Sequence, residues 1–443
     1  MAQEITIVGA GWAGLAAAVK ATQLGLKVNL FEATHTPGGR AKSVVHQGAL
    51  FDNGQHALIG AYSDTLELLQ TIGLEAQALF KRHSLKWSYP NGACFGLPQD
   101  AYPFKALRSL LLCQRFSAVE KSSLLKPLLF ALSHMLWAKE DDTVANLFKG
   151  VSPQIMRDIV SPLCLSALNT PISRASAKTF VRVLRDAFSN PPESCEFLFP
   201  IVPLGEVFPL PCLNWLRERG ARIELGHRID SLDALDPKVP CILALPPWQA
   251  SKLTQDKHAE WSNLAGNLKH EAIASIYLKG ERSAAHSNPA HAHPYPLVCL
   301  NDHFEAENCV HPQFAIQRLA PFETVPFERP SNDPLTKDSL TEDSLTEHWA
   351  LIVSAADPSE RQKIIEHALL AARNHLKLQN VQLQLCTMEK RATFSCDAKL
   401  QRPPSFISEG LMACGDYVQG PYPGTLEGAV RSGLRAVTEL TRN

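Results

Sequence analysis

Short β-branched runs and an alanine-rich stretch alternate at the start of the chain. Residues 5–8 (ITIV) form a short β-branched run, and they lead through a glycine-rich turn into an alanine-rich stretch that reaches Leu24. A second strand pattern, 27–31, ends at Glu32. A strand pattern, a tight turn, a helical pattern and a second strand predict a compact βαβ unit.

The middle of the chain has a different hydrophobic pattern. Between 71 and 190 the apolar spacing is mainly helical, and a hairpin-like segment interrupts it where Trp87 and Tyr89 precede the turn 90–92 (PNG). Strand patterns return further along, and they lie at 221–225, 241–245 and 411–414. The chain therefore combines parallel-sheet elements at its two ends with a mainly helical region between them.

These patterns predict an α/β fold with a discontinuous Rossmann-like domain and an inserted substrate domain of mixed helices and sheet. At 443 residues the chain has room for about two to three domains. We expect the first domain to comprise 1–70, 196–252 and 408–443, and the second 71–195 and 253–407.

A near-repeat stands out in the second half of the chain. From Leu335 the sequence reads LTKDS, LTEDS and LTEHW, and a proline-rich polar stretch precedes it. A five-residue spacing fits neither the helical nor the strand period. We therefore expect a mobile surface insertion over 321–348 without a functional role.

Charge and cysteine content exclude several classes of function. The 43 Lys and Arg residues nearly balance the 44 Asp and Glu residues, so we expect no nucleic-acid partner. The eleven cysteines are scattered singly, with no CxxC pair and no histidine cluster at metal-ligand spacing. This pattern favours reduced, mostly buried thiols in a cytoplasmic protein, without a metal site or disulfides.

The chain carries no sequence signal for secretion or for a membrane span. Its first apolar run lacks a basic region before it, and no segment reaches the ~20 apolar residues that a spanning helix needs. Leucines and scattered cations (Arg115, Lys121, Lys126) occupy the stretch 107–137. This stretch favours either a helix that lies on the cytoplasmic membrane face or one that is packed in the substrate domain.

The glycine-rich turn carries the first chemical signal. Gly9, Gly11 and Gly14 have the spacing that a tight turn, a close approach to pyrophosphate and helix–strand packing require. The following helix directs its N-terminus at the phosphates. Glu32 lies at the end of the second strand, where its carboxylate can accept hydrogen bonds from both ribose hydroxyls. NAD proteins share this fingerprint, so it indicates a dinucleotide without deciding which one.

Two further segments favour FAD. Gly38 and Gly39 provide a second close backbone approach, and Arg40 provides a guanidinium for phosphate. Near the C-terminus, GDY is followed by PGTLEGA, a strand–loop–helix pattern whose helix start can face the flavin ring. The candidate cofactor-binding residues are Gly9, Gly11, Gly14, Glu32, Gly38, Gly39, Arg40, Gly54, Ile229, Gly415, Asp416, Thr425 and Leu426.

Several longer motifs identify a family resemblance. GAGWAGLAAA, the later GGR and the closing GD with TLEGAVRSG resemble the amine oxidase and phytoene desaturase superfamily. FDNGQHALIGAY, PLCLSALNTP, FVRVLRDAF, PLGEVFP and EKRATF resemble the hydroxysqualene dehydroxylase family, also described as squalene-associated FAD-dependent desaturases. The match runs along nearly the whole chain. The chain departs from that family in a short stretch at 231–241 and in the repeat described above.

The resemblance implies a reaction and candidate residues for it. The reaction is reductive removal of the hydroxyl of hydroxysqualene, an allylic alcohol, to give squalene in hopanoid biosynthesis. Loss of the hydroxyl needs an acid, and reduced FAD supplies hydride. His56 and Tyr422 are the candidate catalytic residues, and their alternatives are a structural histidine and a packing tyrosine. A second nucleotide motif is missing, so electrons must come from an external donor.

Other functions remain open at this point. Desaturation of an isoprenoid chain or oxidation of an amine uses the same fold and cofactor, because both directions of hydride transfer are available to a flavin. A non-enzymatic prenyl carrier is the alternative from another class. Such a carrier has no need of Arg40 and Asp416 as a flavin-binding set, and it would be colourless when purified.

Overall fold

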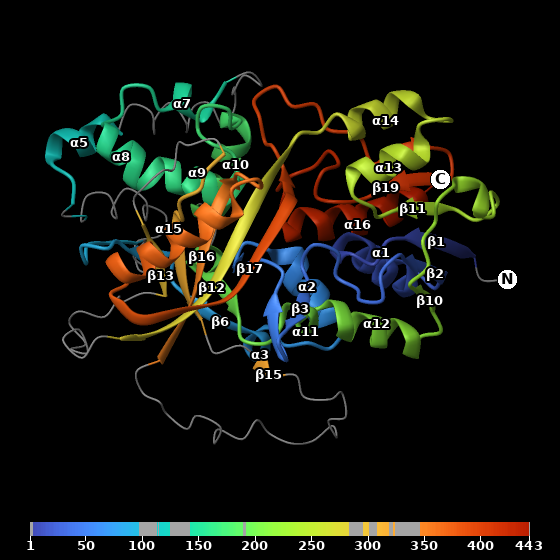
Figure 1. Ribbon diagram of the computed structural model, residues 1–443. Helices are drawn as coiled ribbons and strands as arrows, with labels where there is room; N and C mark the ends of the chain where they lie inside the picture. Colours follow the sequence, from blue (N-terminus) through green and yellow to red (C-terminus); the bar gives the residue numbers. More distant parts are fainter. Residues whose placement is uncertain are drawn as a thin grey trace.

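The structure is a computed structural model of the 443-residue chain. It describes residues 3–96, 113, 115–124, 142–188, 192–282, 296–300, 308–318, 322–323 and 346–442. Two main sheets with their helices lie side by side, and Figure 1 shows the N-terminus and the C-terminus at the same end of the molecule. The apolar stretch predicted at 107–137 falls largely outside the described residues.

The first main sheet has six strands, drawn from both ends and the middle of the chain. In spatial order they are β10 (Arg222–Leu225), β2 (Lys27–Glu32), β1 (Glu4–Val8), β11 (Cys241–Leu243), β19 (Leu411–Ala413) and β18 (Phe406–Ser408). All neighbours pair in parallel except β18 with β19. The inner strands are buried on both faces, which suits their β-branched and apolar residues.

Three long helices pack against this sheet: α1 (Trp12–Gln23), α12 (Pro209–Glu218) and α16 (Leu426–Leu440). The alanines of α1 let α16 approach closely. A Cβ atom on Gly433 would lie 2.1 Å from the carbonyl oxygen of Ala13. This contact requires glycine, and it fixes the C-terminal helix against the first turn of the N-terminal one.

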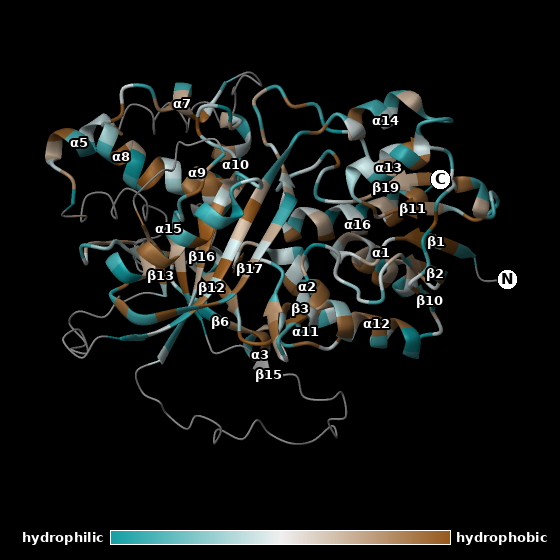
Figure 2. Ribbon diagram, in the orientation of Figure 1, coloured by the Kyte–Doolittle hydropathy of each residue, from teal (hydrophilic) through white to brown (hydrophobic). Residues whose placement is uncertain are grey.

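The second main sheet has seven strands. In spatial order they are β17 (Leu378–Phe394), β12 (His270–Arg282), β16 (Thr346–Ala356), β14 (Phe314–Arg318), β13 (Leu297–Cys299), β7 (Lys86–Ser88) and β8 (Cys94–Gly96). Its pairs are antiparallel apart from β13 with β7. Helix α15 (Arg361–Asn374) contacts this sheet, and Figure 2 shows both hydrophobic and hydrophilic residues along it. Its apolar face packs on the strands.

A group of helices lies at the upper left of Figure 1. It comprises α5 (Ala118–Ser123), α7 (Val144–Leu147), α8 (Pro153–Ile155), a π-helical turn (Met156–Val160), α9 (Ser161–Leu168) and α10 (Ala177–Phe188). Pro162 has no N–H to donate to the preceding turn, which accounts for the irregular turn just before α9. Helix α9 ends at Asn169, which has the left-handed conformation (φ 47°) of a helix C-terminus.

Smaller elements complete the described structure. One three-stranded sheet contains β15 (Phe322–Glu323), β4 (Ala49–Asp52) and β3 (Ser43–His46), and another contains β5 (Leu58–Ile59), β9 (Phe197–Pro200) and β6 (Phe80–His83). The remaining helices are α2 (Ser63–Thr71), α3 (Ala76–Leu79), α11 (Leu204–Val207), α13 (Pro247–Thr254) and α14 (Ala259–Gly266), with 3₁₀ turns at Pro192–Cys195 and Leu232–Ala234.

The predicted elements of the nucleotide-binding sheet are present, and three of the strands, β10, β11 and β19, are shorter than expected. Strand β11 stops at Leu243, before the two prolines that end the pattern. The insertion predicted over 321–348 overlaps two strands: β15 lies inside it, and β16 already begins at Thr346. The repeat therefore runs into regular structure at its third copy. The domain boundaries given above stay predictions.

All eleven cysteines are free thiols in the structure, and ten of them are buried, which confirms the predicted burial. Only Cys94 is exposed. Within the described residues, no helix is long and apolar enough to cross a membrane. Nor do the described histidine, cysteine and acidic residues form a group that could hold a metal ion.

Candidate active site

One cavity of about 710 Å³ collects nearly all the residues predicted from the sequence. It begins at the ends of β1 and β2, passes the starts of α1 and α16, and reaches the strands of the second main sheet. The predicted residues that line it are Gly9, Gly11, Glu32, Gly38, Gly39, Arg40, Gly54, His56, Ile229, Gly415, Asp416, Tyr422, Thr425 and Leu426. Gly14 does not line it.

The three glycines of the first turn have different surroundings. A Cβ atom on Gly9 (φ 109°) would lie 2.4 Å from the carbonyl oxygen of Ala244, and one on Gly14 would lie 1.9 Å from the carbonyl oxygen of Gly9. Both glycines serve chain packing. At Gly11 the nearest atom to such a Cβ is the Cα of Gly39, 3.9 Å away. Gly11 therefore faces open cavity, as a close approach of pyrophosphate requires.

Glu32 holds the loop as well as facing the cavity. Its Oε2 accepts a hydrogen bond from the backbone N–H of Ala10 at 2.8 Å, and its Oε1 accepts two from the N–H and hydroxyl of Thr34 at 2.9 Å. A carboxylate offers about four acceptor positions, so these three bonds leave a position for a ribose hydroxyl. The carboxylate is thus oriented before any ligand binds.

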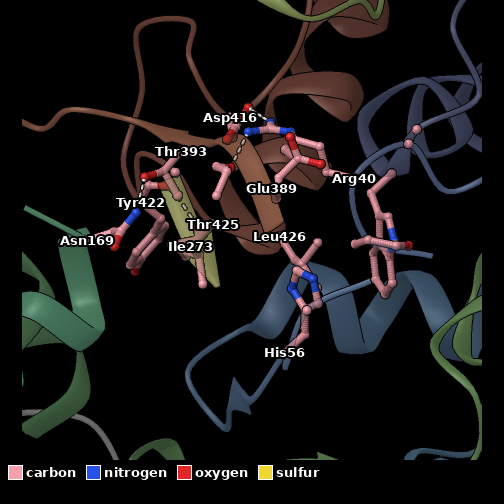
Figure 3. A pocket seen from close by; sticks show the side chains of 18 of the residues that line it. Arg40, His56, Asn169, Ile273, Glu389, Thr393, Asp416, Tyr422, Thr425 and Leu426 are labelled. Atoms are coloured by element: carbon pink, nitrogen blue, oxygen red, sulfur yellow. Dashed lines mark hydrogen bonds and ion pairs between the residues drawn. The ribbon is translucent and has the colours of Figure 1, made fainter. Parts of the chain in front are cut away.

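Arg40 has a partner that the sequence did not indicate. Its Nη2 lies 2.6 Å from Oδ1 of Asp416, and its Nη1 donates to the carbonyl oxygen of Ala392 at 2.6 Å. Figure 3 shows the pair at the edge of the cavity, near Glu389. The role predicted for Arg40, binding of phosphate, must use its remaining N–H donors. The ion pair joins the first segment of the chain to the last.

The start of α16 is fixed by several short contacts. Thr425 caps the helix: its hydroxyl oxygen accepts from the N–H of Gly428 at 3.0 Å and donates to the carbonyl oxygen of Tyr422 at 2.7 Å. A Cβ on Gly428 would lie 2.1 Å from that carbonyl oxygen. The loop before the helix therefore has little freedom, and the helix N-terminus faces the cavity in a defined direction.

Glu427 turns away from the cavity. Its buried carboxylate accepts hydrogen bonds from the N–H groups of Asp64 and Thr65 at 3.1 and 3.0 Å, and from the hydroxyl of Thr65 at 2.6 Å. Arg431 donates to it at 2.8 Å. The side chain thus caps the N-terminus of α2 from the neighbouring helix. Sequence reasoning missed this role, because the two partners lie more than 360 residues apart.

His56 and Leu426 line the same cavity, and Figure 3 labels both side chains. His56 follows Gly54, whose positive φ (90°) and open surroundings bring the loop into the cavity wall. Burial, with a smaller effect from Arg40, lowers the pKa of His56, although Asp52 opposes the shift. The imidazole is therefore neutral at neutral pH, where it can donate a hydrogen bond but is a poor source of a proton.

Tyr422 also lines the cavity, in an uncommon backbone conformation (φ 58°). Its hydroxyl donates to Oδ2 of Asp186 at 2.7 Å, and the guanidinium of Arg431 lies 4.7 Å from the ring centre. Burial and the neighbouring carboxylate of Asp186 raise the pKa of Tyr422 to about 12. Sequence reasoning missed Asp186, although the residue stands inside the motif FVRVLRDAF.

The far part of the cavity is apolar. Side chains from α9, α10, β7, β9, β13 and β14 line it, and they include Leu163, Val183, Leu184, Trp87, Phe197, Phe199, Leu297, Phe314 and Ile316. A wall of this composition suits a hydrocarbon ligand and keeps water out of the space next to it.

The glycine turn gives a direct test of whether a cofactor fits this cavity. A Cβ atom on Gly11 would meet no atom closer than 3.9 Å, and Gly11, Gly39 and Arg40 line the cavity. Open space beside a helix N-terminus and a guanidinium suits the pyrophosphate of a dinucleotide. The residues present therefore fit a large dinucleotide such as FAD.

Comparisons with known proteins agree with this geometry. Residues 7–72 match the family model described as an NAD(P)-binding Rossmann-like domain. The chain is 28% identical over 276 residues to a hydroxysqualene dehydroxylase of Rhodopseudomonas palustris, covering 57% of this chain and 64% of that protein. The expected resemblance to hydroxysqualene dehydroxylases is confirmed, but over 57% of the chain rather than along nearly all of it. A hydroxysqualene dehydroxylase of Sinorhizobium fredii is also 28% identical, over 273 residues, with the same coverage. The chain thus spans somewhat less than two thirds of these relatives.

Solved structures support the fold. An oxidoreductase from Methanosarcina mazei superposes with a TM-score of 0.69 and 14% identity, covering 99% of this chain and 100% of that one. A double mutant of putrescine oxidase superposes with a TM-score of 0.67 and 13% identity, covering both chains completely. The predicted amine-oxidase-like fold with a Rossmann-like domain is therefore confirmed.

Proposed function

We propose that this protein is an FAD-dependent oxidoreductase that removes the hydroxyl group of hydroxysqualene to give squalene. The observation that carries the proposal is that one continuous cavity joins a dinucleotide cradle to an apolar wall. The similarity to hydroxysqualene dehydroxylases supports the substrate, because a long hydrocarbon with one hydroxyl matches a wall of leucine and phenylalanine side chains that contains few polar groups.

The residues that would hold FAD follow from the cavity. Gly11 leaves room for the pyrophosphate beside the N-terminus of α1, and Glu32 has an acceptor position left for the ribose. Gly38 and Gly39 bring a second stretch of backbone to the same place, and Arg40 adds a positive charge. The start of α16, which Thr425 caps, would face the flavin ring.

Bound FAD in its reduced form would supply hydride. The chain's own task is to assist the departure of the hydroxyl, because hydroxide is a poor leaving group. Of the two predicted residues, we propose His56 for this task, because the hydroxyl hydrogen of Tyr422 is already donated to Asp186. Since His56 is neutral, it would act as a hydrogen-bond donor rather than as an imidazolium acid. The apolar wall keeps competing water away from the reacting carbon.

Product analysis under anaerobic conditions tests this function. The holoprotein is reduced with dithionite in D₂O and mixed with hydroxysqualene. The lipids are then extracted and analysed by mass spectrometry. We expect squalene with one carbon-bound deuterium at the former carbinol carbon. A protein that leaves hydroxysqualene unchanged, or that forms a more unsaturated product only when oxidised, would indicate desaturation or another reaction instead.

Two proposals concern partners. We propose an external electron donor for FAD, because the sequence contains a single nucleotide motif. We also propose weak contact with the cytoplasmic membrane face, where such a hydrophobic substrate would be dissolved. Co-sedimentation with anionic liposomes at low salt tests the second proposal, and a protein that stays in the supernatant would refute it.

A further inference from the structure

Tyr422 and Asp186 meet at the wall of the cavity from two distant parts of the chain. Asp186 lies on α10, next to the apolar residues of that helix, and Tyr422 lies in the loop before α16. The phenol hydroxyl donates to Oδ2 of Asp186 at 2.7 Å, and both residues line the cavity. The Asp186 side chain is only 12% exposed. This pair places a charged acceptor inside an otherwise apolar wall.

The surrounding structure holds Tyr422 in one arrangement. A left-handed conformation is uncommon for a residue other than glycine, and it persists where neighbours enforce it. Thr425 donates to the carbonyl oxygen of Tyr422, the missing side chain of Gly428 leaves space for that oxygen, and Arg431 lies over the ring. Such enforced geometry is common at ligand sites.

The direction of the hydrogen bond decides what the pair can recognise. Asp186 also accepts from Nε of Arg185 at 2.8 Å, through its other carboxylate oxygen. The phenol gives its only hydrogen to this carboxylate, so its oxygen can only accept a bond from a ligand. We propose that Tyr422, oriented by Asp186, is the subsite that accepts a hydrogen bond from the hydroxyl group of an alcohol substrate.

This inference rests on the proposed function and adds a consequence to it. An acceptor without a hydrogen to donate can form a hydrogen bond with an O–H group, but it cannot form one with a hydrocarbon. Once the hydroxyl has left as water, the product has nothing to donate to Tyr422. The subsite therefore favours binding of the substrate over the product, and this preference helps squalene to leave. Asp186 is a positioning residue, because it acts through Tyr422.

Equilibrium binding to the oxidised holoprotein tests the subsite without turnover. Hydroxysqualene and squalene, in matched detergent micelles, are titrated against the flavin absorbance of the wild type and of Tyr422→Phe. We expect the variant to bind hydroxysqualene about 3- to 10-fold more weakly, the value of one hydrogen bond, with the affinity for squalene unchanged. The matched control is Tyr89→Phe. It removes a buried hydroxyl that donates to the backbone carbonyl oxygen of Asp158, outside the cavity.

A double-mutant cycle tests the role of Asp186 and distinguishes the two proposals. Asp186→Asn should lower the preference for the alcohol, and adding it to Tyr422→Phe should cause no further loss. An unchanged preference in Tyr422→Phe, or additive losses in the double variant, would overturn the inference. Should Tyr422→Phe fail to retain FAD, Asp186→Asn alone gives the answer. If the holoprotein makes no squalene but the preference depends on Tyr422, the proposed function fails and the subsite stands.

Discussion

Substitutions in the glycine turn should separate cofactor binding from folding. Gly11 has ordinary extended backbone angles (φ −73°, ψ 176°), and a Cβ atom there would meet no atom closer than 3.9 Å. Gly11→Ala should therefore leave the apoprotein as stable as the wild type, or more stable by about 0.4–1 kcal/mol, because the unfolded chain loses freedom. Gly11→Val places two further methyl groups in the space that we assign to the pyrophosphate.

The expected loss of FAD affinity in Gly11→Val follows from overpacking of the site. Forcing extra methyl groups into a filled site typically costs about 1–3 kcal/mol, so Gly11→Val should bind FAD roughly 5- to 150-fold more weakly. Gly14→Ala is the matched contrast, since its Cβ would lie 1.9 Å from a backbone oxygen. That variant should destabilise the apoprotein by about 3 kcal/mol or more.

Two measurements on the same samples check this reasoning. Urea unfolding of the apoproteins reports stability, and titration with FAD, followed by quenching of flavin fluorescence, reports affinity. We expect Gly11→Val to bind FAD more weakly while its urea midpoint stays that of the wild type. We expect Gly14→Ala to unfold at a lower urea concentration. The placement of FAD is refuted if Gly11→Val binds FAD like the wild type. It is also weakened if Gly11→Ala is as unstable as Gly14→Ala.

Four further predictions follow from His56, from the ion pairs and from the thiols. His56→Ala should keep FAD yet lose about 10²- to 10³-fold in rate, the typical effect of removing one positioned hydrogen-bond donor, and full activity would remove the residue from the mechanism. Because the folded pKa of His56 is lowered, unfolding takes up a proton below about pH 6.5, so wild-type stability should fall from pH 7 to pH 5 more than that of His56→Gln in urea titrations. Asp416→Asn should cost about 1–3 kcal/mol of unfolding free energy, whereas Asp233→Asn at an exposed ion pair should leave the unfolding free energy nearly unchanged. In the native state one thiol, Cys94, should react promptly with a thiol reagent, and prompt reaction of several would contradict the burial of the other ten.

The sequence predicted what depends on local pattern. The βαβ unit, the hairpin near Gly92 and the start of the last helix follow from periodicity and turn residues that are neighbours in the chain. The cavity residues that the sequence did predict were found because glycine spacing and family motifs mark them. Asp186 was missed, since a charged residue in an amphipathic helix looks like an ordinary solvent-facing one. The partner of Arg40 was missed for a related reason, because Asp416 lies 376 positions away.

Contacts between the two ends of the chain link cofactor binding to folding. Arg40 pairs with Asp416, Glu427 caps the helix that begins beside Thr65, and Gly433 packs on the first turn of α1. Each of these contacts involves a residue that lines the cavity or stands within a few sequence positions of one that does. The cradle for the nucleotide is therefore complete only when the last segment has docked on the first. A ligand that contacts both segments stabilises this docked state by mass action, so FAD should raise the unfolding midpoint of the whole protein.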